Sequence, residues 1–378
     1  MKVLVIGMTD NPGGMESVVM NYWRRMDRNR IQFDFLSYFP RIAYQEELER
    51  EGARCYVIPR KGGNLRTYGK ALRSFYEAHR GEYTAIWYNT CSLANIDFLV
   101  AAKRTGIPGR IVHAHNAQNE ASKIKGLFHC INRHRIAAYA TEFWSCSDNA
   151  AAYFYPESVR TSASFWMVNN AIDLERFAFK EDAREKVREE FALSPDILVV
   201  GHVGRFSPQK NHSFLLEIFA KILKKRPDAK LLLVGQGELE EGIREKAKEL
   251  GVLDDVIFTG ARSDVEALLS AMDVFLFPSL FEGLPLALLE AQAEGLPCYT
   301  TAHTVPKEAD MTGLVHYLEL SAPPDAWAES VLSTWKEKSR FGSYDERIRA
   351  HGYDIRQEAA LLQQKLMEIS ENNRDNRE

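Results

Sequence analysis

The chain has 378 residues, of which 45% are hydrophobic and 26% are charged, as is ordinary for a soluble globular enzyme. Its length exceeds what one hydrophobic core usually holds, so we expect two domains. The five cysteines are scattered and never closely paired, which argues against a disulfide framework and a zinc site and indicates a reducing compartment. The net charge of −4 conceals a basic first part, with 22 Lys and Arg against 15 Asp and Glu in residues 1–170. This excess indicates either an anionic partner, such as a phospholipid surface or a lipid-diphosphate acceptor, or a solvated charge distribution without one.

Short apolar runs alternate with helical patterns through the first part of the chain. We predict strands at 2–7, 32–36, 55–58, 85–88, 110–115 and 143–146, with helices at 16–25, 65–79 and 93–104. This alternation is typical of a parallel, doubly wound sheet. The first seven residues are too short for a signal sequence, and no apolar run reaches the roughly 20 residues of a membrane span.

The second part repeats the scheme, which predicts two Rossmann-like domains in tandem. Its predicted strands are 198–203, 230–234, 256–259, 273–277 and 314–317, and its helices include 214–224 and 239–250. We place the junction at the turn-forming pair Asn169–Asn170. The predicted organisation is a first domain at 1–172, a second at 173–354, a helix at 355–370 that packs back on the first domain, and a frayed polar tail at 371–378.

The stretch 281–295 reads as a turn and a short helix that begins at Pro285 and ends at Gly295, directly after a buried strand. Turns at the carboxyl ends of parallel strands are where ligands bind, and the free N–H groups of a helix attract anions. Glu282 lies in that turn. Glu290 lies among apolar helix residues, either to bind the paired hydroxyls of a sugar or ribose or to mark the solvent edge of the helix.

Two stretches of the first domain could also carry chemistry. Gly13–Gly14 lies between the first strand and a helix, where a backbone without side chains can approach a phosphate or sugar, although a plain turn explains it equally well. The stretch has neither the dinucleotide fingerprint nor the P-loop spacing. A later strand ends in His113 and His115, which point to one face. We interpret His113 as a core histidine and His115, at the tip, as the functional one.

Two loops of the second domain are further candidates. Arg205 and Lys210 lie on one loop after a strand and could clamp a diphosphate, although surface loops often carry such charges without function. The strand end at 258–264 contains a glycine and Arg262, and a planar base could rest there. Without further support, this last stretch reads as an ordinary turn.

Together these stretches resemble the retaining glycosyltransferases of family 4, which have the GT-B fold of two facing Rossmann-like domains with a cleft between them. Glu282 and Glu290 match the family's Glu-x7-Glu pair, and the Gly204–Asn211 loop matches a further motif. Residues 168–177 are similar to the hinge segment that is usually written with Asn-Gly-Ile-Asp. The chain departs from it with Asn170 in place of glycine, and asparagine also tolerates positive φ.

The resemblance implies a hexosyltransferase and a role for each matched residue. The implied donor-binding residues are Gly13, Gly14, Arg205, Lys210, Arg262, Glu282, Gly283, Leu284 and Glu290, and the implied catalytic residues are His115, Glu282, Arg205 and Lys210. Arg205 and Lys210 would hold the diphosphate of a nucleotide sugar. Glu290 would hold the ribose hydroxyls, Glu282 the hydroxyls of the transferred sugar, and the backbone at Arg262 would meet the base.

Residues 304–308 and 352–355 resemble the bacterial capsular and exopolysaccharide branch of the family. That likeness implies a cytoplasmic enzyme, peripheral on the inner face of the membrane, with a UDP-sugar donor, a lipid-linked oligosaccharide acceptor and no nucleic-acid partner. The predicted membrane contact consists of Lys123, Lys125, Arg133 and Arg135, interleaved with Leu127, Phe128 and Ile131.

No Asp-x-Asp motif occurs in the chain, so we expect no metal cofactor. The charge of the leaving diphosphate would then be neutralised by Arg205, Lys210 and the N-terminus of the Pro285 helix. Two alternatives remain: an inactive glycosyltransferase-like binding subunit, and a nucleotide-sugar 2-epimerase. A dehydrogenase is disfavoured because the dinucleotide fingerprint is missing.

Overall fold

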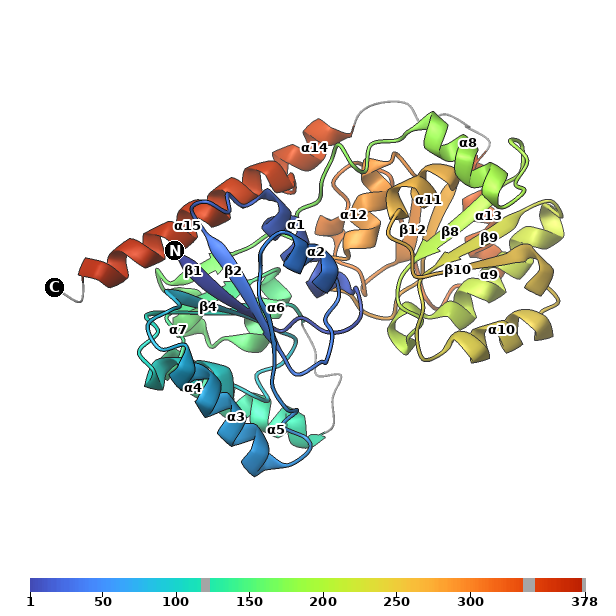
Figure 1. The fold of residues 1–378 in the computed structure, drawn as a ribbon. Coiled ribbons are helices and arrows are strands. Elements are labelled where there is room, and N and C mark those ends of the chain that lie inside the picture. Colours follow the sequence, from blue (N-terminus) through green and yellow to red (C-terminus); the bar gives the residue numbers. More distant parts are fainter. Residues whose placement is uncertain (117–122, 336–343, 376–378) are drawn as a thin grey trace. The chain divides into compact units, whose positions relative to one another are not determined.

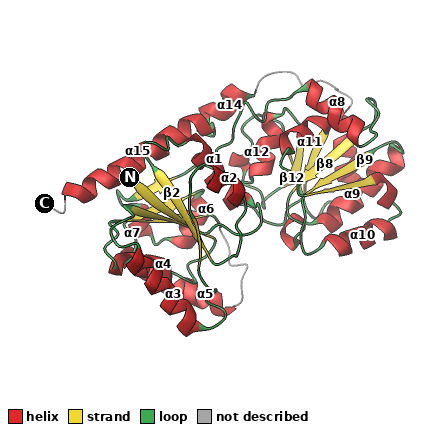
Figure 2. Cartoon of the chain, viewed as in Figure 1, coloured by secondary structure: helices red, strands yellow, loops and turns green. Residues whose placement is uncertain are grey.

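The computed structural model describes residues 1–116, 123–335 and 344–375, and the chain forms two compact units. The first unit comprises residues 1–171 and 355–378, and the second comprises residues 172–354. Each unit is built on one parallel β-sheet with helices packed around it (Figures 1 and 2). This is the α/β architecture of two Rossmann-like domains that the alternating pattern predicted.

The first unit contains a seven-stranded sheet with the order β3-β2-β1-β4-β5-β6-β7, all pairs parallel. Its strands are β1 (Lys2–Ile6), β2 (Gln32–Ser37), β3 (Cys55–Val57), β4 (Ala85–Thr90), β5 (Gly109–Ala114), β6 (Glu142–Ser145) and β7 (Phe165–Met167). Its helices are α1 (Gly14–Arg25), α2 (Gln45–Arg50), α3 (Leu65–Ala78), α4 (Asp97–Arg104), α5 (Lys123–Arg135), α6 (Asp148–Phe154), α7 (Glu157–Arg160) and α15 (Ile355–Asp375).

The second unit contains a six-stranded sheet with the order β10-β9-β8-β11-β12-β13, again parallel throughout. Its strands are β8 (Val199–Val203), β9 (Lys230–Val234), β10 (Val256–Gly260), β11 (Val274–Phe277), β12 (Cys298–Thr301) and β13 (Val315–Leu318). Its helices are α8 (Glu181–Glu190), α9 (His212–Lys225), α10 (Glu240–Glu249), α11 (Val265–Ala271), α12 (Leu286–Ala293), α13 (Pro324–Trp335) and α14 (Asp345–Ala350). The central strands are apolar runs because helices cover both faces, and β11 is fully buried.

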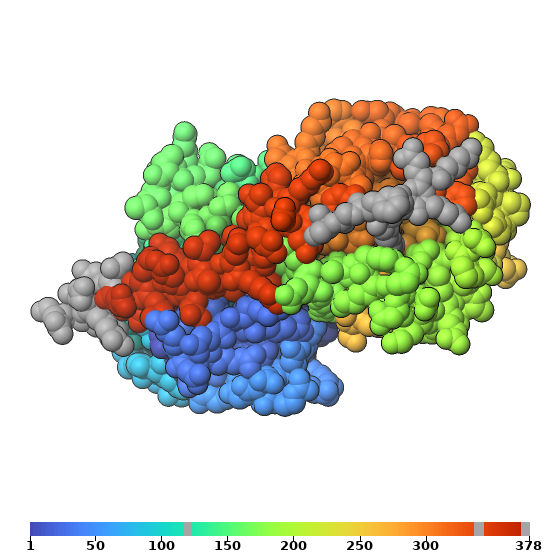
Figure 3. Space-filling model, turned by 90° about the horizontal axis from the view of Figure 1, so that it is seen from above, coloured from blue at the N-terminus to red at the C-terminus, as the bar shows by residue number. Residues whose placement is uncertain are grey.

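The last helix, α15, belongs to the first unit. Its Leu362 and Leu366 are fully buried, and the Gln363 side chain accepts a hydrogen bond of 2.8 Å from the Asp27 N–H. Figure 3 shows α15, in red, lying along the N-terminal residues, in blue. The helix continues to Asp375, five residues beyond the predicted end of the helix at 370. Residues 376–378 lie outside the described part of the chain.

Three smaller expectations also need correction. Helix α4 begins at Asp97 instead of Leu93, because the Asn95 side chain accepts a hydrogen bond from the Asp97 N–H and shapes a turn there. Pro285 is the N-cap of α12, with φ −75° and ψ 115°, and the helix begins one residue later. Asn170 is not among the non-glycine residues with positive φ, because the turn is closed by the Ala171 N–H donating to the Asn169 carbonyl at 2.8 Å.

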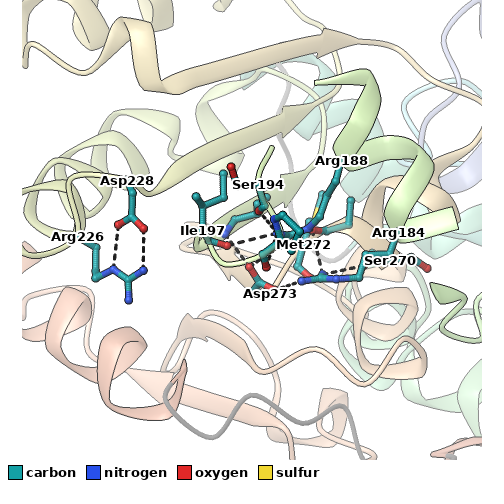
Figure 4. A network of polar contacts seen from close by, with 12 residues as sticks. Arg184, Arg188, Ser194, Ile197, Arg226, Asp228, Ser270, Met272 and Asp273 are labelled. Atoms are coloured by element: carbon teal, nitrogen blue, oxygen red, sulfur yellow. Dashed lines mark hydrogen bonds and ion pairs between the residues drawn. The ribbon is translucent and has the colours of Figure 1, made fainter. Parts of the chain in front are cut away.

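An ion network fixes α8 to the start of β11 (Figure 4). The Asp273 carboxylate binds Arg184 at 2.6 Å and Arg188 at 2.8 Å, and it accepts the Val199 N–H at 2.8 Å. Arg188 is buried and also donates to the carbonyl oxygens of Ala271 and Ser194. Asp273 therefore holds two guanidinium groups that would otherwise be desolvated without a counter-charge.

Candidate functional site

Two loops at the carboxyl edge of the second sheet are fastened to each other. The loop after β8 ends in a short 3-10 helix, Pro208–Lys210, and the loop after β11 leads into α12. The Leu280 N–H donates to the Gln209 carbonyl at 2.8 Å, and the Gln209 amide donates to the Phe281 carbonyl at 2.9 Å. These bonds place two stretches that are 72 residues apart in the sequence at one place on the sheet.

Lys210 and Glu282 form an ion pair where these loops meet. The Lys210 Nζ lies 2.6 Å from Glu282 Oε1, and the two side chains are only 15% and 7% exposed. The same ammonium lies 4.6 Å from the ring centre of Phe277, and the Glu282 N–H donates to the Thr304 carbonyl at 2.9 Å. The structure thus brings together a cation suited to phosphate and a carboxylate suited to sugar hydroxyls.

Glu290 lies in the middle of α12, whereas Glu282 lies in the loop that precedes this helix. Burial raises the pKa of its carboxyl to about 7, with a smaller raising effect from Glu266 and a lowering effect from Arg176. Arg176 itself forms an ion pair with Glu266 at 2.7 Å, and this carboxylate offsets most of its effect on Glu290. The Glu290 carboxyl makes no side-chain hydrogen bond to any residue in the described ranges. A ligand with hydroxyl groups would supply the missing donors.

The two predicted arginines are placed differently. The Arg205 side chain is 62% exposed and binds Glu238 at 3.0 Å, so the structure does not place it with Lys210 on Glu282. The Arg262 guanidinium is occupied by Glu190 and Asp264, both at 2.7 Å. Its backbone N–H makes no hydrogen bond within the part of the chain that the structure describes.

The glycine turn of the first unit is held by a residue that sequence reasoning passed over. The Glu16 carboxylate is buried and accepts hydrogen bonds from the Thr9 N–H at 3.0 Å, the Thr9 hydroxyl at 2.8 Å and the Gly13 N–H at 3.2 Å. A Cβ on Gly13 would lie 2.8 Å from that carboxylate, whereas a Cβ on Gly14 would meet nothing within 4 Å. Gly13 is thus committed to the turn, and Gly14 is the residue with open space beside its backbone.

The two histidines lie side by side at the end of β5, with ring centres 4.0 Å apart. His113 is fully buried and accepts a hydrogen bond of 3.3 Å from the Trp87 indole, as a core residue would. His115 is partly exposed, and its Nε2 lies 2.9 Å from the Asn89 side-chain oxygen. Burial lowers the pKa of His115 to about 3 and that of His113 well below its ordinary value, so both rings are neutral.

Within 1–116, 123–335 and 344–375, no group of three or more His, Cys, Asp and Glu side chains is arranged to hold a metal ion. Likewise, no described helix has the length and apolar character needed to cross a membrane.

Comparison with known proteins identifies the family. Residues 183–351 match the family model described as glycosyl transferases group 1. The chain is 34% identical over 362 residues to the putative glycosyltransferase EpsF of Bacillus subtilis, covering 93% of this chain and 92% of that protein. It is 30% identical over 262 residues to an Escherichia coli UDP-Gal:alpha-D-GlcNAc-diphosphoundecaprenol alpha-1,3-galactosyltransferase, covering 66% of each.

Solved structures agree with the fold. Anabaena Alr3699/HepE in complex with UDP and glucose superimposes with a TM-score of 0.78 at 17% identity, covering 97% of this chain and all of that one. WaaG, a glycosyltransferase involved in lipopolysaccharide biosynthesis, gives a TM-score of 0.70 at 18% identity, covering 95% and 98%. The chain is therefore a glycosyltransferase with the GT-B fold and belongs to the group 1 glycosyl transferases, the family 4 type that its motifs resemble.

Proposed function

We propose that this enzyme transfers a sugar from a UDP-sugar to a lipid-linked saccharide during bacterial surface polysaccharide synthesis, with retention of the donor's anomeric configuration. The main observation in support of the donor site is the Lys210–Glu282 ion pair, which lies before the N-terminus of α12. Glu290, on α12 itself, has a carboxyl without a hydrogen-bond donor among the described residues. The HepE complexes with UDP and UDP-glucose support the choice of base. The E. coli galactosyltransferase, whose name gives a diphosphoundecaprenol-linked acceptor, supports the choice of acceptor.

Each residue then has a task. Lys210 leaves Glu282 for the diphosphate, and Arg205 reaches the diphosphate by leaving Glu238. Glu282, released from Lys210, accepts hydrogen bonds from the transferred sugar beside the backbone of Gly283 and Leu284, while Glu290 accepts those of the ribose. Gly13, Gly14 and His115 of the first unit contact the substrates. No metal takes part, because Lys210, Arg205 and the N-terminus of α12 supply the positive charge.

A panel of nucleotide sugars tests this proposal. A bound ligand at 100 times its Kd adds about 2.7 kcal/mol to the free energy of unfolding, so thermal shifts rank UDP- and GDP-sugars directly. The best ligand, labelled in the sugar, is then incubated with enzyme and a lipid-linked acceptor. Transfer to the acceptor is expected. An epimerised donor would identify a 2-epimerase, and binding without turnover would identify an inactive subunit.

The raised pKa of Glu290 predicts a pH dependence of donor affinity. Ribose hydroxyls donate to the ionised carboxylate, so affinity for a UDP-sugar is full above the pKa of about 7 and declines as the pH falls below it. The decline approaches about tenfold per pH unit. Glu290→Gln should weaken binding above pH 7 and flatten this profile, whereas Glu294→Gln, at the C-cap of α12, should preserve it. Titration calorimetry between pH 5.5 and 8.5 measures both, and an unchanged slope in Glu290→Gln would assign the pH dependence to another group.

The outer face of α5 supports a membrane partner. The inward-facing residues of this helix are the polar His129 and Asn132, which bind the backbone N–H and carbonyl of Leu93 at 3.0 and 2.7 Å. Four of the outward side chains are large and apolar: Ile124, Leu127, Phe128 and Ile131 are 69%, 61%, 50% and 43% exposed. A helix that buries polar residues and exposes apolar ones at helical spacing suits the interface of a bilayer.

The basic residues of α5 indicate which bilayer it would meet. Lys123 and Lys125 are exposed and form no ion pair with any described residue, whereas Arg133 and Arg135 donate to the carbonyl of Tyr155 and the hydroxyl of Tyr139. We therefore propose that α5 docks on anionic phospholipid, with the apolar face in the interface and the two lysines at the headgroups.

Vesicle sedimentation measures this docking. The protein should bind phosphatidylglycerol vesicles more tightly than phosphatidylcholine vesicles, and salt should weaken the binding. Replacing Lys123 and Lys125 by glutamine removes about 1 kcal/mol each, or roughly 30-fold in total. Leu127→Gln with Phe128→Gln should also weaken binding, while Leu361→Gln, an exposed leucine on α15, should not. Equal binding to both lipids, or loss only in the control, would refute the assignment.

A further inference from the structure

Asn89, at the end of β4, is buried and holds its side-chain amide in one orientation. It is 1% exposed and pairs in register with His113 of β5. Its Nδ2 donates to the Trp87 carbonyl at 3.3 Å, which leaves Oδ1 to face the imidazole of His115 at 2.9 Å. Because an amide oxygen only accepts hydrogen bonds, the His115 Nε2 must carry the proton.

This contact determines which nitrogen of the His115 imidazole is available to a ligand. A neutral ring with its proton on Nε2 has a lone pair on Nδ1. Nδ1 makes no hydrogen bond to any residue that the structure describes, and the side chain is partly exposed. The titratable group packed against the ring is His113, itself neutral and bound by the Trp87 indole at 3.3 Å. The Nδ1 of His115 can thus accept a hydrogen bond from a ligand, and it carries no proton to donate.

The backbone around Asn89 leaves little freedom. Gly7, which follows β1, has a φ of 121°, and a Cβ there would lie 2.0 Å from the Asn89 carbonyl oxygen. The His115 N–H donates to the Thr90 carbonyl at 3.1 Å. The start of the glycine turn, Asn89 and His115 are therefore fixed to one another at the carboxyl ends of β1, β4 and β5.

We propose that Asn89 is a positioning residue that fixes His115 as the Nε2–H tautomer, so that His115 Nδ1 accepts a hydrogen bond from a substrate hydroxyl. This inference rests on the proposed function only in the last clause, which needs His115 to meet substrate. The tautomer itself is a property of the free protein.

Nitrogen-15 NMR of histidine-labelled full-length enzyme, without substrate, tests the tautomer, with His115 assigned by its loss in His115→Gln. We expect protonated Nε2 and unprotonated Nδ1 in the wild type. Asn89→Ala should give a mixture of tautomers. Asn89→Asp keeps an acceptor but places a negative charge beside Nε2, which moves the titration of His115 toward and above its ordinary value of about 6.5. Asn132→Asp changes a buried asparagine whose Nδ2 donates to the Leu93 carbonyl; it is the control and should leave the His115 signals unchanged.

Kinetics test the consequence for turnover. Asn89→Ala should lower turnover roughly five- to tenfold, as loss of one hydrogen bond does. Asn89→Asp should be active at high pH and lose activity as the pH falls through the new His115 titration, a shift that mere loss of stability would not produce. A wild-type Nδ1–H tautomer, or identical spectra in Asn89→Ala, would overturn the proposal. Correct spectra with unaltered turnover in His115→Gln would instead remove His115 from the proposed function.

Discussion

Replacing Lys210 by alanine is expected to lower turnover by a factor on the order of 10² or more, comparable to losing one oxyanion donor. A departing nucleotide diphosphate develops negative charge, and the chain offers no Asp-x-Asp motif to bring a metal to it. Lys210 is the less exposed of the two predicted phosphate-binding cations: its side chain is 15% exposed, whereas that of Arg205 is 62% exposed. Removing Lys210 also leaves the Glu282 carboxylate, 7% exposed, without its counter-charge. Steady-state transfer rates at saturating donor measure the effect.

Lys221 provides a matched control for that experiment. It forms an ion pair of 2.7 Å with Asp325, and the two side chains are 34% and 53% exposed. Lys221→Ala should leave turnover unchanged and cost no more than about 1 kcal/mol of stability. If Lys210→Ala were as active as this control, the charge of the leaving group would be met elsewhere, and the Lys210–Glu282 pair would be a structural contact.

Asp273→Ala is expected to destabilise the second unit by about 3 to 5 kcal/mol, the cost of breaking a buried ion pair from one side. Both Arg184 and Arg188 would lose their carboxylate, and the Arg188 side chain is only 5% exposed. The Val199 N–H at the start of β8 would lose its acceptor as well. Denaturant unfolding of the full chain, followed at the transition of the second unit, measures the loss.

The control for Asp273 is the second pair drawn in Figure 4. Asp228 binds Arg226 at 2.9 Å with side chains that are 48% and 28% exposed. Because solvent screens this pair, Asp228→Ala should cost about 1 kcal/mol or less. Equal losses in the two variants would mean that the Asp273 network contributes no more than an exposed ion pair.

The fold was largely predictable because most strands are apolar on both faces, as parallel strands between helices must be. The runs at β8, β9 and β11 could hardly form anything else. The strands that were missed carry weaker signals. Strand β7 has three residues, and β12 reads Cys-Tyr-Thr-Thr, in which both threonines are buried because their hydroxyls bind the carbonyls of Phe277 and Ser279.

Residues of the candidate site could be predicted only where they belong to a sequence motif with a characteristic spacing. The turn and helix at 281–295 and the loop at 204–211 are both recognisable as motifs, and the structure joins them through the ion pair of Lys210 with Glu282. Glu16 and Asn89 leave no comparable mark, since each acts through contacts with backbone and side chains that only the fold brings near. Similarly, the sequence suggested Arg262 but not that Glu190, 72 residues earlier, binds its guanidinium.

The most direct test of the proposed chemistry is an NMR measurement of the transferred sugar's anomeric configuration in the presence of EDTA. A UDP-sugar labelled with carbon-13 at the anomeric carbon is incubated with enzyme and acceptor, and the coupling at that carbon is compared between donor and product. We expect the product to keep the donor's configuration and the rate to be unaffected by EDTA, because protein cations and a helix N-terminus neutralise the leaving group. An inverted product, or loss of activity in EDTA that manganese or magnesium restores, would contradict this account.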